Sequence, residues 1–125
     1  MACGFHNDAV EFQAKDGVKL IDTLAKFRNL LSHRRERLPA SRVGTVAFMK
    51  QYPGKTDCLL LTDGPADANR NVPLFGKGDT PWKKVFGAAE TMGGIKYYLL
   101  THGATDMTQM ETVKRGLEQY RRIHG

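Results

Sequence analysis

Hydrophobic and polar positions alternate in blocks that predict strands and helices in turn, most clearly between Lys55 and Gly103. The apolar run from Asp57 to Thr62 predicts a strand that ends in polar residues. Apolar residues recur every three or four positions from Trp82 to Met92, which predicts an amphipathic helix. A second apolar run from Ile95 to Leu100 predicts another strand. This order predicts a β-α-β unit, in which functional side chains gather where the strands end.

The flanking segments predict further elements of the same kind. The stretch from Cys3 to Asn7 predicts a short strand, and the apolar spacing from Leu20 to Leu38 predicts a long helix that Pro39 ends. A short helix is expected from Val46 to Tyr52, and a final one has its apolar positions between Met110 and Tyr120. Strands that alternate with helices in this way are typical of a parallel α/β fold.

The chain length and the number of predicted strands limit the architecture. A chain of 125 residues favours one domain, so residues 1–125 are expected to form a single α/β unit. Three or four strands do not close a barrel, which needs eight. An open sheet of this size leaves its edges exposed unless a partner covers them. The chain is therefore expected to form a homo-oligomer, most simply a homodimer.

Composition indicates a globular protein without a membrane segment. Hydrophobic residues make up 41% of the chain and charged residues 26%, and no apolar run approaches the roughly 20 residues that cross a bilayer. The first residues lack the basic flank and long apolar stretch of a secretory signal. The two cysteines, Cys3 and Cys58, fit reduced thiols inside the fold. Together these features predict a cytoplasmic protein with no membrane partner.

Positive charge is concentrated in one short segment. The net charge is +6, and five arginines lie close together: Arg28, Arg34, Arg35, Arg37 and Arg42. Such a segment is typical of a nucleic-acid-binding surface, although no recognised nucleic-acid motif accompanies it. The interpretation that we favour is a solvated helix end. A third interpretation is a dimer contact, because Phe27, Leu30 and Leu31 are interspersed with these charges.

Several motifs occur in an order that resembles a known family. They are Gly4-Phe5-His6-Asn7-Asp8 with Glu11-Phe12, then Tyr52-Pro53-Gly54-Lys55, Thr62-Asp63, Val72-Pro73-Leu74-Phe75-Gly76-Lys77-Gly78, Pro81-Trp82 and Tyr97-Tyr98-Leu99-Leu100. Together they resemble the C-terminal portion of the sugar phosphate isomerase/epimerase family, the xylose-isomerase-like TIM barrels. The resemblance covers residues 3–24 and 43–123. It implies a partial, half-TIM-barrel chain, with a divergent segment at about residues 25–42.

The resemblance also implies that the family's divalent-metal site is altered. Leu60 stands where the family has a histidine ligand, and Thr101 stands where it has a glutamate, although Asp63 is retained. A further aspartate would come from the divergent segment, which has no likeness to the family. The resemblance therefore implies a degenerate member without the family's metal-dependent catalysis, acting by binding a sugar or sugar phosphate. The cofactor is left unknown, since a divalent metal is possible but its expected ligands are missing.

Polar residues near strand ends define the candidate site. His6, Asp63 and His102, with Glu11, would meet at one edge of a parallel sheet. If they form a rebuilt metal site, the alternative function is a metal-dependent sugar isomerase or epimerase. If they only support the fold, Asp63 and His6 are hydrogen-bonded remnants and His102 is a loop residue. The glycine-bearing loop Gly64–Gly78 is a further candidate, for a phosphate. A basic nucleic-acid-binding module is the remaining class.

Overall fold

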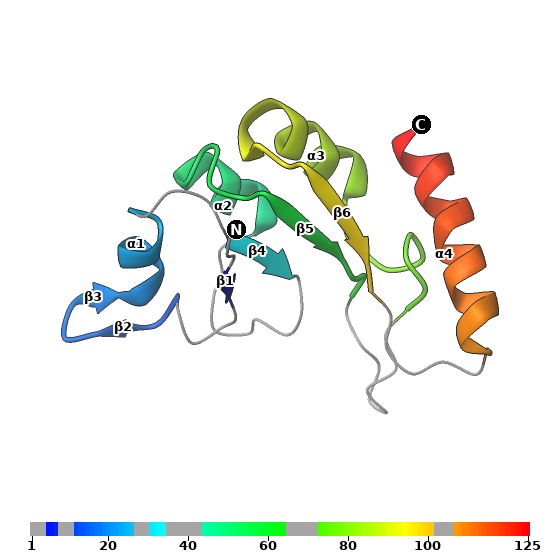
Figure 1. Ribbon diagram of the computed structural model, residues 1–125, viewed down its shortest axis with the longest axis horizontal. Helices are drawn as coiled ribbons and strands as arrows, with labels where there is room; N and C mark the ends of the chain where they lie inside the picture. The colour runs from blue at the N-terminus through cyan, green and yellow to red at the C-terminus, as the bar shows by residue number, and fades with distance from the viewer. Residues whose placement is uncertain (1–4, 8–11, 27–30, 35–43, 65–72, 102–106) are drawn as a thin grey trace, which may run out of the picture.

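A computed structural model describes residues 5–7, 12–26, 31–34, 44–64, 73–101 and 107–125 of the chain (Figure 1). The strands and helices within these ranges form a mixed α/β fold with no closed barrel. The predicted α/β class is therefore confirmed. Of the helices in these ranges, none has the length and apolar character needed to cross a membrane.

Four parallel strands form the main sheet. They are β1 (Phe5–Asn7), β4 (Leu31–Arg34), β5 (Cys58–Leu61) and β6 (Tyr97–Leu100), and their order in the sheet is β1-β4-β5-β6. Each neighbouring pair runs parallel. The strands therefore follow one another across the sheet in chain order, unlike a doubly wound sheet, whose strand order reverses. β1 and β6 are the two edges of this sheet.

A small antiparallel hairpin precedes the first helix. It joins β2 (Ala14–Lys15) to β3 (Val18–Lys19) through Asp16 and Gly17, both of which have positive φ angles. Asp and Gly are the residues that adopt this backbone region at least cost, which explains why the turn forms at this pair. α1 (Leu20–Leu24) follows directly, and its Ile21 packs against Phe48 in a small separate core.

The helices beyond α1 cover one face of the main sheet. α2 (Thr45–Gln51) and α3 (Trp82–Ala88) lie above the strands in Figure 1, and α3 continues as a π-helical turn, η2 (Ala89–Gly93). Leu59 and Leu61 of β5 are almost fully buried under these helices. The buried residues of this core are Met49, Leu59, Leu61, Phe75, Trp82, Val85, Phe86, Ala88 and Ala89. Because side chains alternate along a strand, Cys58 and Leu60 point to the opposite face.

α4 (Gln109–His124) packs beside β6 and completes the described fold. The Thr108 side chain accepts a hydrogen bond from the Glu111 backbone N–H at 3.3 Å, which begins the helix with a standard cap. A Cβ on Gly116 would lie 2.6 Å from a Leu100 methyl group, so a larger residue here would require the Leu100 side chain to shift. The last turn of α4 ends at His124, whose ring stacks on Tyr120 with centroids 4.9 Å apart.

The predicted long helix from Leu20 to Leu38 is wrong. Its first turn forms α1, but Leu31–Arg34 is strand β4, which pairs with β1 on one side and β5 on the other. The helical spacing of leucines was a local signal, and pairing with two distant strands outweighs it. β4 is a strand inside the sheet, so the helix assumed for the dimer contact does not form over residues 31–34, and the contact itself stays a prediction. Residues 27–30 and 35–43 lie outside the described ranges.

Candidate functional site

Asp63 follows β5 and lies at the centre of the best-defined polar arrangement in the described residues. It is only 2% exposed. Its Oδ1 accepts hydrogen bonds from the backbone N–H groups of Gly64 at 3.0 Å and Thr80 at 3.3 Å. Its Oδ2 accepts from Gly76 N–H at 2.8 Å, Gly78 N–H at 3.1 Å and the Trp82 indole Nε1 at 3.0 Å. Five donors from one loop and one helix start thus converge on a single carboxylate.

These donors hold Asp63 in its ionised form. Burial raises the pKa of the carboxyl group, but hydrogen bonds from the Thr80 and Trp82 side chains and from the Gly78 and Gly64 backbone outweigh it. The net result is a pKa below the ordinary value. A carboxylate has about four lone-pair sites, and the donors of its own loop already fill them. Asp63 is therefore placed to hold the loop against β5.

The glycines of this loop are required by the same arrangement. Gly76 has a φ of 80°, a conformation that residues with a side chain rarely adopt. A Cβ on Gly78 would lie 2.4 Å from Asp63 Oδ1 and 2.4 Å from the Gly64 carbonyl oxygen. In the described part of the loop, the backbone N–H groups of Gly64, Gly76 and Gly78 thus already bind a carboxylate of the protein and are not free to bind a phosphate.

Two threonines meet where β5 and β6 end. The Thr62 and Thr101 hydroxyl groups are hydrogen-bonded to each other, and Thr101 N–H donates to the Leu61 carbonyl at 3.3 Å. Thr62 is 1% exposed. At the position where the resemblance implies a glutamate ligand, the chain thus has a hydroxyl that is bonded within the sheet.

Leu60 occupies the position of the implied histidine ligand. It pairs in register with Leu99 of β6 and lies on the sheet face opposite the helices. An aliphatic side chain offers no donor atom to a metal ion. Among the residues that the structure describes, no three His, Cys, Asp or Glu side chains are grouped closely enough to hold one. The described residues therefore do not fit the metal site that the resemblance implies.

Of the three predicted site residues, only Asp63 has a described side chain. His6 lies in β1, where its backbone pairs with Ser32, and Ser32 pairs in turn with Cys58. The His6 backbone is therefore level with the start of β5, about 16 Å along the strand direction from Asp63 at 3.3 Å per residue. His102 and Glu11 lie outside the described residues. The structure does not bring His6 and Asp63 to the same level, and catalysis by the three residues stays a prediction.

A shallow hollow lies next to the Asp63 loop, between the start of α3 and the last turn of α4. Its volume is about 290 Å³. It combines a buried indole with two lysines at the start of α3, and its lining residues are Gly76, Thr80, Pro81, Trp82, Lys83, Lys84 and Ile123. An apolar wall with a few polar and cationic groups is the usual character of a small-molecule site.

Sequence reasoning found Asp63 but missed its partners. The sequence predicts that Trp82 begins a helix and that the glycines lie in a loop, without linking any of them to Asp63. The available signal was an Asp-Gly pair after a strand, followed by Gly-x-Gly and a tryptophan. Comparison of the sequence with protein-family models and with curated proteins finds no match.

Proposed function

We propose that this chain is a degenerate half-barrel relative of the sugar phosphate isomerases and epimerases, which binds a sugar phosphate without the family's metal-dependent catalysis. The observation that carries the proposal is the state of Asp63. The acidic residue retained from the family motif is buried, and every oxygen of its carboxylate accepts hydrogen bonds from its own loop. It serves the fold at the place where the family carries out chemistry.

The order of the strands supports the half-barrel part of the proposal. Four parallel strands follow chain order, and α2 and α3 pack on one face of the sheet. A TIM barrel is built in this way, from consecutive strands with all helices outside. β4 lies where the resemblance calls for a strand, although its sequence has no likeness to the family. The fold thus agrees with the resemblance better than the sequence of the divergent segment does.

Two further positions support the loss of metal catalysis. Leu60 and Thr101 lie on adjacent strands, where the resemblance implies two metal ligands. Leu60 has no ligand atom, and the Thr101 hydroxyl is engaged by Thr62. A protein that only binds a sugar phosphate does not need a metal ligand at either position.

The hollow beside α3 is the proposed binding place. Lys83 and Lys84 are exposed at its rim and carry the positive charge that a phosphate group requires. The buried Trp82 and the side chains of Pro81 and Ile123 form the apolar part of its lining. The hollow lies between the start of α3 and the last turn of α4, beside the loop that Asp63 holds.

Calorimetric titration with a panel of aldose and ketose phosphates tests the proposal. Saturable binding is expected, and the double variant Lys83→Gln/Lys84→Gln is expected to weaken it by about tenfold or more, since each lost phosphate contact costs roughly 1.5 kcal/mol. The matched control is Lys50→Gln with Lys114→Gln, at exposed lysines on α2 and α4. Absence of binding to every sugar phosphate at millimolar concentration contradicts the proposal.

Catalysis is measured on the same samples. Deuterium uptake from solvent next to the sugar carbonyl, with Mn²⁺ or Mg²⁺ present, reports the proton transfer of an isomerase or epimerase. We expect none above the rate of the buffer. Uptake that disappears in His6→Ala or His102→Ala would favour the rebuilt enzyme instead. Binding to DNA that falls steeply with salt would favour the nucleic-acid module.

A further inference from the structure

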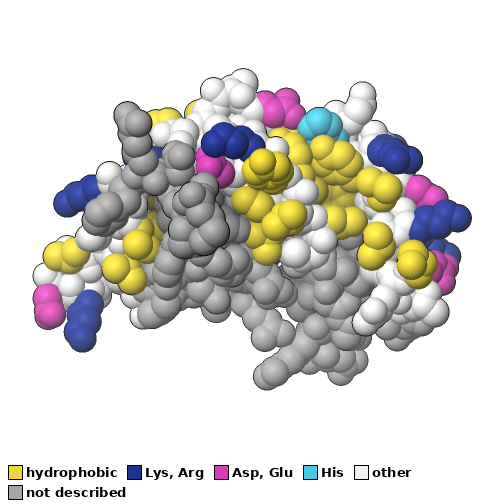
Figure 2. Space-filling model, viewed as in Figure 1, with side chains coloured by type: hydrophobic (Ala, Val, Ile, Leu, Met, Phe, Trp, Pro, Cys, Tyr) yellow, Lys and Arg dark blue, Asp and Glu magenta, His cyan; other side chains and the backbone are white. Residues whose placement is uncertain are grey.

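The exposed hydrophobic side chains of the described residues gather in particular places. Seven large hydrophobic residues are exposed in these ranges, and neither α2 nor α3 carries any of them. They are Val18, Leu20, Tyr97, Leu99, Met110, Val113 and Leu117. They belong to β6, to α4 and to the hairpin with the start of α1. In Figure 2, hydrophobic side chains are visible over the middle of the sheet, along α4 and at the α1 end.

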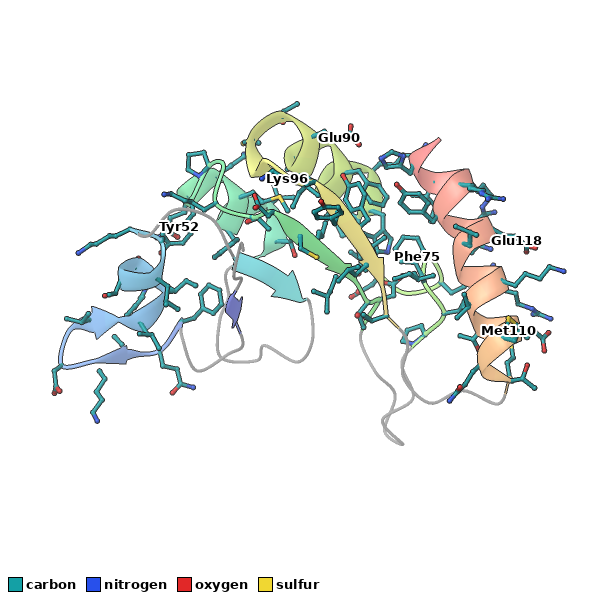
Figure 3. All side chains as sticks on the ribbon, in the orientation of Figure 1. Tyr52, Phe75, Glu90, Lys96, Met110 and Glu118 are labelled. Carbon is teal, nitrogen blue, oxygen red and sulfur yellow. The ribbon has the colours of Figure 1, made fainter. Side chains whose placement is uncertain are left out.

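On α4 the exposed residues form one stripe. Met110, Val113 and Leu117 are 79%, 56% and 42% exposed, and their spacing of three and four residues places them on one side of the helix. Met110 begins this stripe near the start of α4 in Figure 3. The stripe lies beside the surface that packs on β6 through Gly116. α4 therefore presents two apolar surfaces, and the described fold covers one.

On β6 the exposed residues lie on the sheet face that the helices do not cover. Tyr97 is 65% exposed and Leu99 is 50% exposed, while the alternating Tyr98 and Leu100 pack in the core. Parallel sheets are almost always covered on both faces. β6 is also an edge of the main sheet, and β1 is the other edge. Edges of this kind are a template for pairing with another chain.

We propose that the partner is a second copy of this chain, joined head to tail so that β6 of each copy pairs in parallel with β1 of the other. This arrangement rests on the half-barrel proposed above. Two sheets of four parallel strands then form a ring of eight, the number that closes a TIM-type barrel. Tyr97 and Leu99 face the interior of the ring, and both sheet edges disappear.

The same arrangement accounts for the exposed residues at the two ends of the molecule. In such barrels the helix that follows one strand packs against the helix that follows the next strand. The α4 stripe of one copy therefore meets α1 of the other, where Val18 and Leu20 are 59% and 50% exposed. A twofold axis repeats this contact, so the ring closes and does not grow into a filament. A dimer joined only through its two β6 strands would leave Val18 and Leu20 exposed.

Chromatography with light scattering on matched variants tests the proposal. The wild type is expected at twice the chain mass of 14.0 kDa. Val113→Glu, on the α4 stripe, and Leu20→Glu, on α1, are each expected to weaken dimerisation by at least tenfold. The control Arg122→Gln changes the charge of α4 by the same single unit at another exposed position and is expected to stay dimeric.

Mixing the two variants separates the ring, in which β6 pairs with β1, from a dimer joined only through its two β6 strands. In the proposed dimer, α4 of each copy contacts α1 of the other, which gives two such contacts. A dimer of one Val113→Glu copy and one Leu20→Glu copy has both substitutions in one of these contacts and none in the other. The mixture of Val113→Glu and Leu20→Glu is therefore expected to form more dimer than either variant alone. Circular dichroism of each variant confirms that it is folded. A monomeric wild type, or a Leu20→Glu protein as dimeric as the wild type, overturns the proposal, whereas sugar phosphate binding tests the proposed function independently.

Discussion

The indole Nε1 of Trp82 donates a hydrogen bond to Asp63 Oδ2 at 3.0 Å, and this bond joins the first residue of α3 to the end of β5. The Trp82 ring also packs against Phe75, with ring centroids 4.6 Å apart. The end of β5, the loop after it and the start of α3 are thus held together by the Asp63 carboxylate and by the contact between Phe75 and Trp82. Stability and the position of the candidate ligand hollow are therefore coupled through Asp63.

Replacing Asp63 by Asn is expected to lower the free energy of unfolding by about 3 kcal/mol. The amide loses the negative charge that five donors share, and its NH₂ group turns one acceptor into a donor facing backbone N–H groups. Urea unfolding followed by circular dichroism measures the change.

The control is Asp57→Asn, which removes the partner of Lys96. That ion pair has a distance of 3.1 Å, but the Lys96 side chain is 58% exposed, so its loss is expected to cost less than about 1 kcal/mol. Equal losses in the two variants would show that the Asp63 hydrogen bonds contribute no more than a surface pair.

Acid is expected to destabilise the protein through the same residue. The pKa of Asp63 is lower in the folded chain than its ordinary unfolded value of about 3.9. The contribution of this carboxylate is therefore present above that unfolded value and is lost as the pH falls through the folded pKa. Urea unfolding between about pH 5 and pH 2 should show a steep loss in the wild type and a shallower one in Asp63→Asn. Parallel curves would contradict the assignment.

The strands and helices with a strong local pattern were predictable from the sequence. β5, β6, α2 and the helix formed by α3 with η2 lie within a residue or two of their predicted bounds, because each has a continuous apolar run or a regular helical spacing. β4 was not, since Leu31-Ser32-His33-Arg34 has neither β-branched residues nor alternation. Its strand conformation depends on β1 and β5, which are distant in sequence.

The candidate site was predictable only at its centre. Asp63 stands out as an acidic residue after a buried strand. The direction of a backbone N–H is not encoded by any one residue type, so the donors from Gly76 and Gly78 were not visible in the sequence. The position of His6 along the sheet relative to Asp63 depends on the strand register, which is set by the pairing of whole strands.

Replacing Gly78 by Ala is expected to destabilise the protein by about 2 kcal/mol. The added Cβ would lie 2.4 Å from Asp63 Oδ1 and from the Gly64 carbonyl oxygen, neither of which has room to move without breaking hydrogen bonds. Thermal and urea unfolding measure the effect. A change below 0.5 kcal/mol, on the order of an ordinary surface substitution, would show that the loop relaxes freely.

Gly87→Ala in α3 is the matched control for this substitution. A Cβ at Gly87 meets no atom within 4 Å, and Gly87 lies inside a helix. Alanine at such a position is expected to stabilise the protein by about 0.5 to 1 kcal/mol, because it restricts the unfolded chain and favours the helix. If alanine lowers the free energy of unfolding at Gly78 and raises it at Gly87, the destabilisation is specific to the Asp63 loop.

Tyr98 is expected to ionise late in an alkaline titration. Burial first, and then the negative charge of Glu90, raise the pKa of its hydroxyl to about 12. Glu90 lies near the end of α4 in Figure 3, where it bonds His124 at 2.6 Å. Because the folded pKa exceeds the unfolded value of about 10, the stability from neutral Tyr98 is present below that value and is lost as the pH rises through about 12.

Tyrosinate absorbance of Glu90→Gln tests the cause of this shift. Removing the charge is expected to bring the ionisation of Tyr98 to lower pH, with a smaller change in the same direction for Tyr120, whose pKa is raised first by burial and then by Glu90. Glu118→Gln, at an exposed position on α4, serves as the control. The Tyr98 signal is assigned by its loss in Tyr98→Phe. If Glu90→Gln leaves the titration unchanged while Tyr98→Phe removes the late step, burial alone sets the pKa and the proposed influence of Glu90 is refuted.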